Sequence, residues 1–186
     1  MAMTNAYTGA NGTLTLADEN SAAGADAKLV MDTYELRTVG RLTGVQVRVD
    51  TRLEEFHEIG RRHAASLHPG NISVSGQVDR AYVNGALLFL LLGRGASPTQ
   101  TPEPYPQPQF SMTLALHDPA VPSATASLEL KGVTFENWAY TLPEDDFVVE
   151  NLRFRALTIS VLDKEAPAAG GDAVAKAPTF PDAAQA

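Results

Sequence analysis

Residues 71–93, NISVSGQVDRAYVNGALLFLLLG, run from an alternating segment into a block of apolar residues. The first part of this stretch alternates apolar and polar side chains, which is the period-two pattern of a strand with one buried face. Residues 86–92 are then apolar without interruption. Asn84 can cap the start of a helix, and Gly93 suits the position just after its end. We therefore predict a strand followed by a short helix over about residues 82–92.

The predicted helix has no polar side. A helix on the surface of a globular protein needs only an apolar stripe, and a transmembrane helix needs about 20 apolar residues, far more than this block supplies. The helix must therefore be covered on every side, either by its own domain or by another subunit. Leu88 and Leu91 are our candidates for contact with another subunit.

Composition narrows the class of protein. The 186 residues are enough for one domain with a good core. The formal net charge is −8, with 22 acidic against 14 basic residues, which disfavours a module that grips nucleic-acid phosphates. Cysteine is absent, so neither disulfides nor thiolate chemistry can operate. The first residues show neither a basic start nor an apolar stretch, so we expect no secretory signal.

Alternating segments recur along the chain and indicate a mainly β protein. We count about seven or eight strands, which favours an antiparallel sandwich or barrel with one short helix packed on it. A change of phase near Asn137 predicts a bulge. Residues 18–27 are expected to form a loop and 28–36 a weak strand. The clearest predicted strands are Thr13–Ala17, Leu42–Arg52, Phe110–Leu116, Ser127–Leu130 and a hairpin that joins Gly132–Leu142 to Phe147–Leu162 across an acidic turn.

Other segments lack the pattern of regular structure. Residues 61–70 are polar and end in Pro69-Gly70, a turn signal. Residues 95–109 hold five prolines and cannot form a helix or a central strand. Residues 164–186 are mostly Ala, Pro and Gly, which predicts a tail that is disordered or ordered by a partner. The expected organisation is a β domain over 1–163, with an arm or loop at about 37–70, followed by this tail.

Basic residues gather in one part of an acidic chain. Six of the 14 lie between residues 37 and 62, together with four acidic residues. One interpretation is a solvated face of mixed charge; the other is a projecting arm that pairs with acidic loops of another subunit. On the second interpretation, the candidate interface residues here are Arg41, Arg48, Arg52, Glu54, Glu55, Arg61 and Arg62.

No constellation of residues points to catalysis. The segment HEIGRRH at 57–63 approaches a zinc motif, but the motif needs its second histidine where Arg61 stands. The chain has neither a Gly-rich phosphate loop that opens a helix nor the G-x-S-x-G of a nucleophile elbow. We predict a protein that is not an enzyme, with no catalytic, cofactor or metal site.

Three segments together resemble the tail tube proteins of bacteriophages, especially those with contractile tails. YTGANGTLTLA at 7–17 is similar to the amino-terminal strand of that family, and residues 71–93 resemble its central strand and helix. LKGVTFENWAYTLPEDDFVVENLRFRALTISV at 130–161 resembles its closing hairpin with the acidic turn. The Pro-rich loop and the Ala/Pro tail fit the family less clearly.

The resemblance implies a virion protein, made in the cytoplasm of the host bacterium, whose subunits close into hexameric rings. The rings would stack into a tube through which DNA passes without specific binding, and the net charge agrees with an acidic bore. Implied partners are sheath, tape measure, baseplate and terminator proteins. One alternative is the tube subunit of a type VI secretion or bacteriocin-like particle. Another is a ligand-binding β-sandwich in which Trp138, Tyr140 and Tyr105 form a sugar platform; a hydrolase has the least support.

Overall fold

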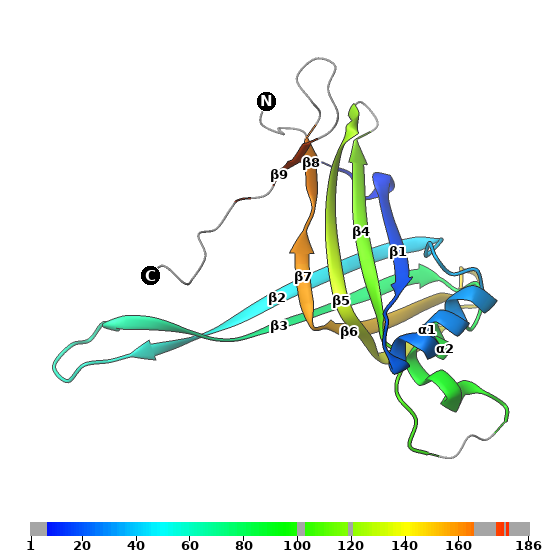
Figure 1. The fold of residues 1–186 in the computed structure, drawn as a ribbon, viewed down its shortest axis with the longest axis horizontal. Helices are drawn as coiled ribbons and strands as arrows, with labels where there is room; N and C mark the ends of the chain where they lie inside the picture. The colour runs from blue at the N-terminus through cyan, green and yellow to red at the C-terminus, as the bar shows by residue number, and fades with distance from the viewer. Residues whose placement is uncertain (1–6, 100–102, 119–120, 166–173, 177, 179–186) are drawn as a thin grey trace.

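Two groups of antiparallel strands cross steeply in the computed structural model and share one strand, β5 (Val121–Thr141) (Figure 1). The structure describes residues 7–99, 103–118, 121–165, 174–176 and 178. The first group contains β1 (Gly12–Asp18), β4 (Phe110–Asp118), β7 (Thr158–Val161), β8 (Asp163–Glu165) and the first half of β5. The second contains β2 (Leu42–Phe56), β3 (Ser66–Ala81), β6 (Val149–Ala156) and the second half of β5.

Strand β5 turns the corner between the two groups. Its pairing with β6 shifts register between Phe135 and Asn137, which confirms the predicted bulge. The predicted strands Ser127–Leu130 and Gly132–Leu142 are thus parts of one strand. The opposite correction applies after the acidic turn, where one predicted strand is divided into β6 and β7. Between β6 and β7 the chain crosses from the second group of strands to the first.

The core lies between the two groups. Phe110 and Phe135 pack with ring centroids 5.2 Å apart, and Leu130, Leu152 and Phe154 are fully buried around them. The inward side chains come from alternate positions of each strand, as the period-two pattern requires. This arrangement confirms the predicted mainly β, antiparallel fold class.

One ion pair is buried inside this apolar core. Arg80 on β3 is 2% exposed and Glu150 on β6 is fully buried, and the two are direct partners across the strand pair. Arg80 Nε donates to Glu150 Oε1, and Trp138 Nε1 donates to Glu150 Oε2 at 2.7 Å. Arg80 also donates to the backbone oxygen of Asn84 at 3.4 Å. The pair therefore links three strands to the connection that leads into the second helix.

The helix α1 (Ala22–Thr33) occupies residues that we expected to form a loop and a weak strand, so both predictions were wrong. Ser21 caps it, because its Oγ accepts a hydrogen bond from the backbone nitrogen of Gly24 at 2.9 Å. Ala27 and Met31, four residues apart, point into the core. Small residues with a cap and this spacing favour a helix.

The helix α2 (Ala86–Leu92) lies within the predicted range 82–92. Gly93 has a positive φ of 56° just after the last helical residue, so the predicted end signal is confirmed. The N-cap is Gly85, one residue later than predicted, and Asn84 Oδ1 accepts from the backbone nitrogen of Ala86 at 3.3 Å from the position before the cap. The short 3-10 turns are Gly9–Asn11 (η1) and Gly93–Ala96 (η2).

The Pro-rich segment 95–109 is described except for residues 100–102, and its end is fixed against α2. Gln107 Nε2 donates to the backbone oxygens of Leu91 at 3.2 Å and Phe135 at 2.7 Å, while Pro108 is buried. The predicted tail is partly ordered, because β9 (Val174–Lys176) pairs with β8. Lys164 and Glu165 of the predicted tail belong to β8 and residue 178 is described, while 166–173, 177 and 179–186 lie outside the described residues. No helix in the described part of the chain is long and apolar enough to cross a membrane.

Candidate assembly surfaces

Strands β2 and β3 continue far beyond the body of the protein as a hairpin, which we call the arm, residues 50–73 (Figure 1). Ala64 is half-buried, and every other arm residue is exposed. The predicted polar connection at 61–70 is corrected, because β3 already begins at Ser66 and Pro69-Gly70 lies inside it. Pro69 is tolerated because β6 pairs with β3 only from Val74 onward, so in the arm β3 has one neighbour.

One face of the arm is uncovered and largely apolar, with Thr51 and Glu55 as its polar members. Val45 and Val47 of β2 pack on the core, and the same face of the hairpin continues outward with other apolar residues. Leu53 is 57% exposed and Leu67 58% exposed on that face. The uncovered members of this stripe are Val49, Leu53, Leu67 and Ile72. Such a stripe on a projecting element is typical of a surface that another protein covers.

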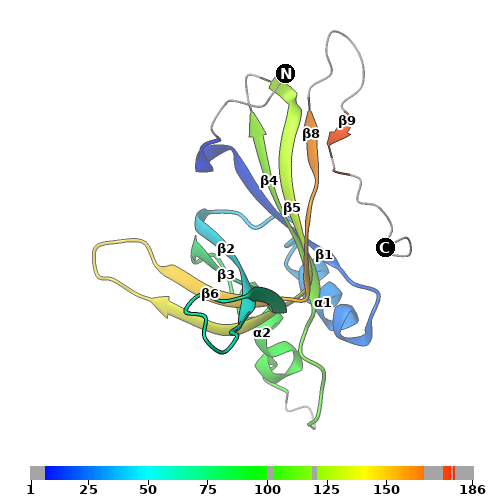
Figure 2. The same ribbon diagram turned by 90° about the vertical axis from the view of Figure 1, so that its left-hand side faces the viewer.

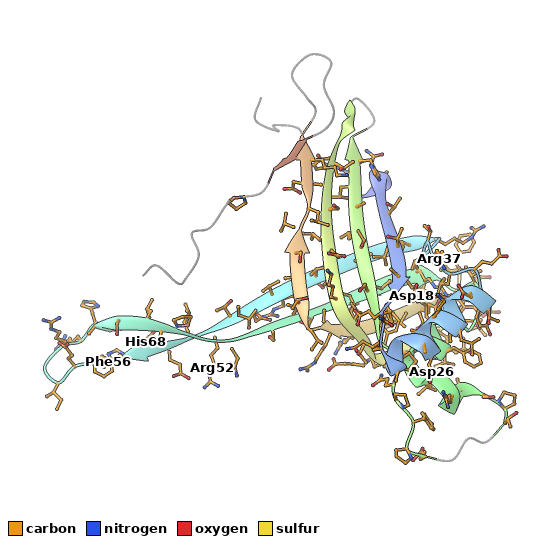
Figure 3. All side chains as sticks on the ribbon, viewed as in Figure 1. Asp18, Asp26, Arg37, Arg52, Phe56 and His68 are labelled. Atoms are coloured by element: carbon orange, nitrogen blue, oxygen red, sulfur yellow. The ribbon has the colours of Figure 1, made fainter. Side chains whose placement is uncertain are left out.

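The arginines of the basic cluster at 37–62 do not all lie together. Arg52 lies on the arm with Phe56 and His68, whereas Arg37 lies at the other end of the molecule, beside α1 (Figure 3). Arg37 pairs there with Asp32 at 3.2 Å. Arg41, just before β2, accepts at its backbone oxygen from the nitrogen of Ala81 at 3.0 Å, so it too lies away from the arm.

The other charged candidates are exposed. Arg48 pairs with Asp50 at 2.8 Å where the arm leaves the body. On the arm, Glu54 faces His68 across the strand pair. Three more candidates lie toward the tip: Glu55, whose carboxylate is 3.2 Å from His57, Arg61, which pairs with Glu58 at 3.2 Å, and Arg62.

At the other end of β3, exposed apolar side chains form a second uncovered surface, and Tyr140 is the one member of it that the sequence singled out. Tyr82 stacks on Tyr140 with centroids 5.8 Å apart, and Leu142 and Phe147 flank the acidic turn with 72% and 79% of their surface exposed. Register brings these residues together, since Ala81 and Thr141 both pair with Val149. We call Tyr82, Val83, Tyr140, Leu142, Phe147 and the turn 144–146 the acidic end.

A third surface is the outer side of the four strands β2, β3, β6 and β5, which we call the polar face. Asp79 accepts there from Gln77 Nε2 at 3.1 Å and from Asn151, and Arg155 pairs with Glu136 at the bulge. The charged residues on it are Arg48, Asp50, Asp79, Glu136, Arg153 and Arg155. Three are positive and three negative, so the face is neutral overall.

The subunit itself covers much of α2, which contacts β5, α1 and η2. Ala86, Leu87 and Leu90 are buried, whereas Leu88 and Leu91 are half-buried. The interface role of Leu88 and Leu91 stays a prediction.

Two ion pairs hold α1 against its neighbouring elements. A hydrogen bond from its own backbone amide and one from Lys28 lower the pKa of Asp18. Asp26 accepts two hydrogen bonds from Arg94, at 2.9 and 3.0 Å, and thereby raises the pKa of that guanidinium. These pairs join α1 to β1 and to η2, and they lie away from the arm (Figure 3).

The aromatic residues proposed as a sugar platform have other surroundings. Trp138 turns its nitrogen inward to the buried Glu150, and its ring centroid lies 4.9 Å from that of Tyr140. Tyr105 instead lines an open cleft beside α2, together with Leu91, Leu92, Gln107 and Glu136. Within the described ranges, no group of three or more His, Asp or Glu residues could hold a metal ion.

Comparison with known proteins finds similarity in structure. No protein-family model matches the chain, and no curated protein matches it. A chain of the sheath–tube complex of PVC, an extracellular contractile injection system, has 9% identity and a TM-score of 0.58, covering 87% of this chain and 95% of that chain. A chain of the anti-feeding prophage baseplate has 12% identity and a TM-score of 0.59, covering 86% and 97%. The SPP1 tail tube has 12% identity and a TM-score of 0.54, covering 84% and 78%.

These similarities extend over most of the chain, so the protein has the fold of tail tube proteins. The sequence resemblance to that fold is thereby confirmed. The identities of 9–12% make this a likeness of architecture.

Proposed function

We propose that this protein is a structural subunit that assembles, six copies to a ring, into the hollow tail tube of a virion or a related injection particle. The observation that carries the proposal is a tail-tube fold whose long arm has an exposed apolar face. A monomer in water gains nothing from such a face, and assembly buries it.

The polar face is the surface that we assign to the bore. It offers hydrogen-bonding groups from four adjacent strands, and its six charges cancel. A wall without net positive charge does not hold phosphates, so DNA can move along it without binding. On this assignment, the net charge of −8 is carried by other surfaces of the subunit, and we expect a neutral bore where the family resemblance implied an acidic one.

The second candidate function is the tube of an injection particle whose cargo is not a genome. The TM-scores to chains of the PVC and anti-feeding prophage particles support it, since they equal or exceed that to the SPP1 tail tube. Capsid and terminase genes beside the gene for this protein would favour the phage tail, and genes for an injection apparatus would favour the particle. A sheath, a baseplate and a terminator are partners on either proposal.

The purified protein should form rings or tubes that are visible by negative-stain electron microscopy. We expect six-fold symmetric end views, because rings of six copies are proposed. Analytical ultracentrifugation over a range of concentrations provides a second measurement. A species that stays monomeric at high concentration in both measurements contradicts the proposal.

Charge reversal on the arm should reduce tube growth while leaving the subunit folded. Arg52→Glu changes an exposed side chain, so the free energy of unfolding should shift by less than about 1 kcal/mol. Arg37→Glu is the matched control, because it makes the same change in charge outside the arm. Tube length and yield by electron microscopy are the readout. An equal reduction of tube growth in both variants would mean that assembly depends on the net charge of the subunit and not on the arm.

A further inference from the structure

We propose that the arm of one copy docks on the acidic end of a neighbouring copy. This inference rests on the proposed function for the occupant, a second copy of this chain, and it identifies which two surfaces meet. Both surfaces are uncovered in the single subunit, and the tip of the arm is opposite in charge to the acidic end.

The arm contributes an apolar stripe and a basic tip. Leu53 and Leu67 are near neighbours on one face of the hairpin, and Ile59 at the tip is fully exposed. The tip, residues 57–65, holds Arg61 and Arg62 against a single acidic residue, Glu58. A partner for the arm should therefore present exposed apolar side chains next to negative charge.

The acidic end has both properties. Leu142 and Phe147 stand on either side of Glu144, Asp145 and Asp146, and the stacked Tyr82 and Tyr140 lie beside them. Between Gly132 and Leu152 the chain contains no lysine or arginine, so these carboxylates have no basic neighbour along that segment. Exposed aromatic and aliphatic residues are the usual anchors at the centre of protein interfaces.

An arm cannot reach the acidic end of its own subunit. The 16 residues of β3 separate the arm tip from the position where Ala81 meets Val149. At about 3.3 Å per residue, this strand spans roughly 50 Å. In Figure 2 the arm points toward the viewer, whereas the β5–β6 hairpin that carries the acidic turn projects to one side. The contact must therefore join two copies.

Because the two surfaces are unlike, the contact is head-to-tail. Such a heterologous contact produces closed rings or open stacks, whereas contact between like surfaces produces a two-fold dimer. Each copy uses its arm once and its acidic end once, so every apolar stripe is covered except at the ends of the assembly. This property is what a growing tube requires.

The absence of cysteine from the chain allows a direct test by cross-linking. Full-length Ile59→Cys and Phe147→Cys variants are mixed under assembly conditions, oxidised and separated by size under non-reducing conditions, with one variant carrying a mass tag. We expect the mixed disulfide to form in clear excess over either homodimer. Leu29→Cys, at an exposed position of α1, replaces Phe147→Cys in the control mixture.

Two outcomes overturn the inference. Dimers of Ile59→Cys with itself in excess would show that arms meet arms, and a mixed product no greater than that of the control would show that the arm docks elsewhere. Leu67→Cys with Leu142→Cys is a second pair, to be used if either first variant loses its native circular dichroism spectrum. Both pairs lie at exposed positions, where a cysteine should leave the fold intact.

A charge exchange separates this inference from the proposed function. Arg61→Glu with Arg62→Glu should abolish assembly, and combining them with Asp145→Arg and Asp146→Arg should restore it. Restored assembly supports the pairing of the arm with the acidic end. If the restored assemblies are flat rings or dimers, the proposed tube is wrong and the proposed docking still stands. Tubes that form without the mixed disulfide would overturn the docking and leave the tube proposal standing.

Discussion

Replacing Arg80 with alanine is expected to lower the free energy of unfolding by about 3–5 kcal/mol, the usual cost of removing one partner of a buried ion pair. Glu150 would keep its hydrogen bond from Trp138 but lose the positive charge that offsets its burial. The loss is a large fraction of the total stability of a typical domain. Urea denaturation followed by tryptophan fluorescence measures it, since Trp138 is the only tryptophan.

A matched control and a double variant sharpen this prediction. Arg155→Ala breaks an ion pair with Glu136 on the exposed polar face, so it should cost less than about 1 kcal/mol. Replacing Arg80 with methionine and Glu150 with leucine together should recover part of the loss, because an apolar pair does not need charge compensation, although Trp138 Nε1 then loses its acceptor. Similar losses for Arg80→Ala and Arg155→Ala would show that burial of the pair is not important to stability.

Leu90→Ala is expected to cost about 2–5 kcal/mol, because it leaves a cavity under α2. Leu90 is fully buried between the helix and the sheets, whereas Leu92 on the same helix is 45% exposed. Leu92→Ala is therefore the control, with an expected cost of less than about 1 kcal/mol. Thermal denaturation of both variants provides the measurement. Similar costs at the two positions would show that the helix is covered by another subunit and not by its own domain.

Local signals in the sequence determined much of this fold. Period-two alternation identified the strands, the change of phase near Asn137 identified the bulge, and Gly93 identified the end of α2, whereas the N-cap is Gly85 instead of the predicted Asn84. The helix α1 was missed. Ser21 is a residue that commonly caps a helix, but the apolar residues that follow it do not form a clean stripe. Leu29, for example, is exposed.

The candidate assembly surfaces were harder to predict, for two physical reasons. Alternation shows that one face of a strand is apolar, but it does not show whether the same chain covers that face. The exposure of Leu53 could therefore not be predicted, and Leu67 was placed in a polar connection although it lies in β3. The acidic end is built from three separate segments around Tyr82, Tyr140 and Phe147, which only the pairing of strands brings together. Clustered arginines did indicate the arm, although Arg37 and Arg41 lie elsewhere.

Strand β5 has a mechanical consequence for the subunit. It is hydrogen-bonded to β4 and β7 along its first half and to β6 along its second, so the two layers of the subunit are joined by an unbroken covalent chain. A force on the arm, directed along the strands, is transmitted from β3 through its hydrogen bonds with β6 to β5. Because the force runs along the strand axes, many hydrogen bonds resist it together and do not break one after another. The subunit can therefore transmit tension from one end to the other without its layers sliding apart.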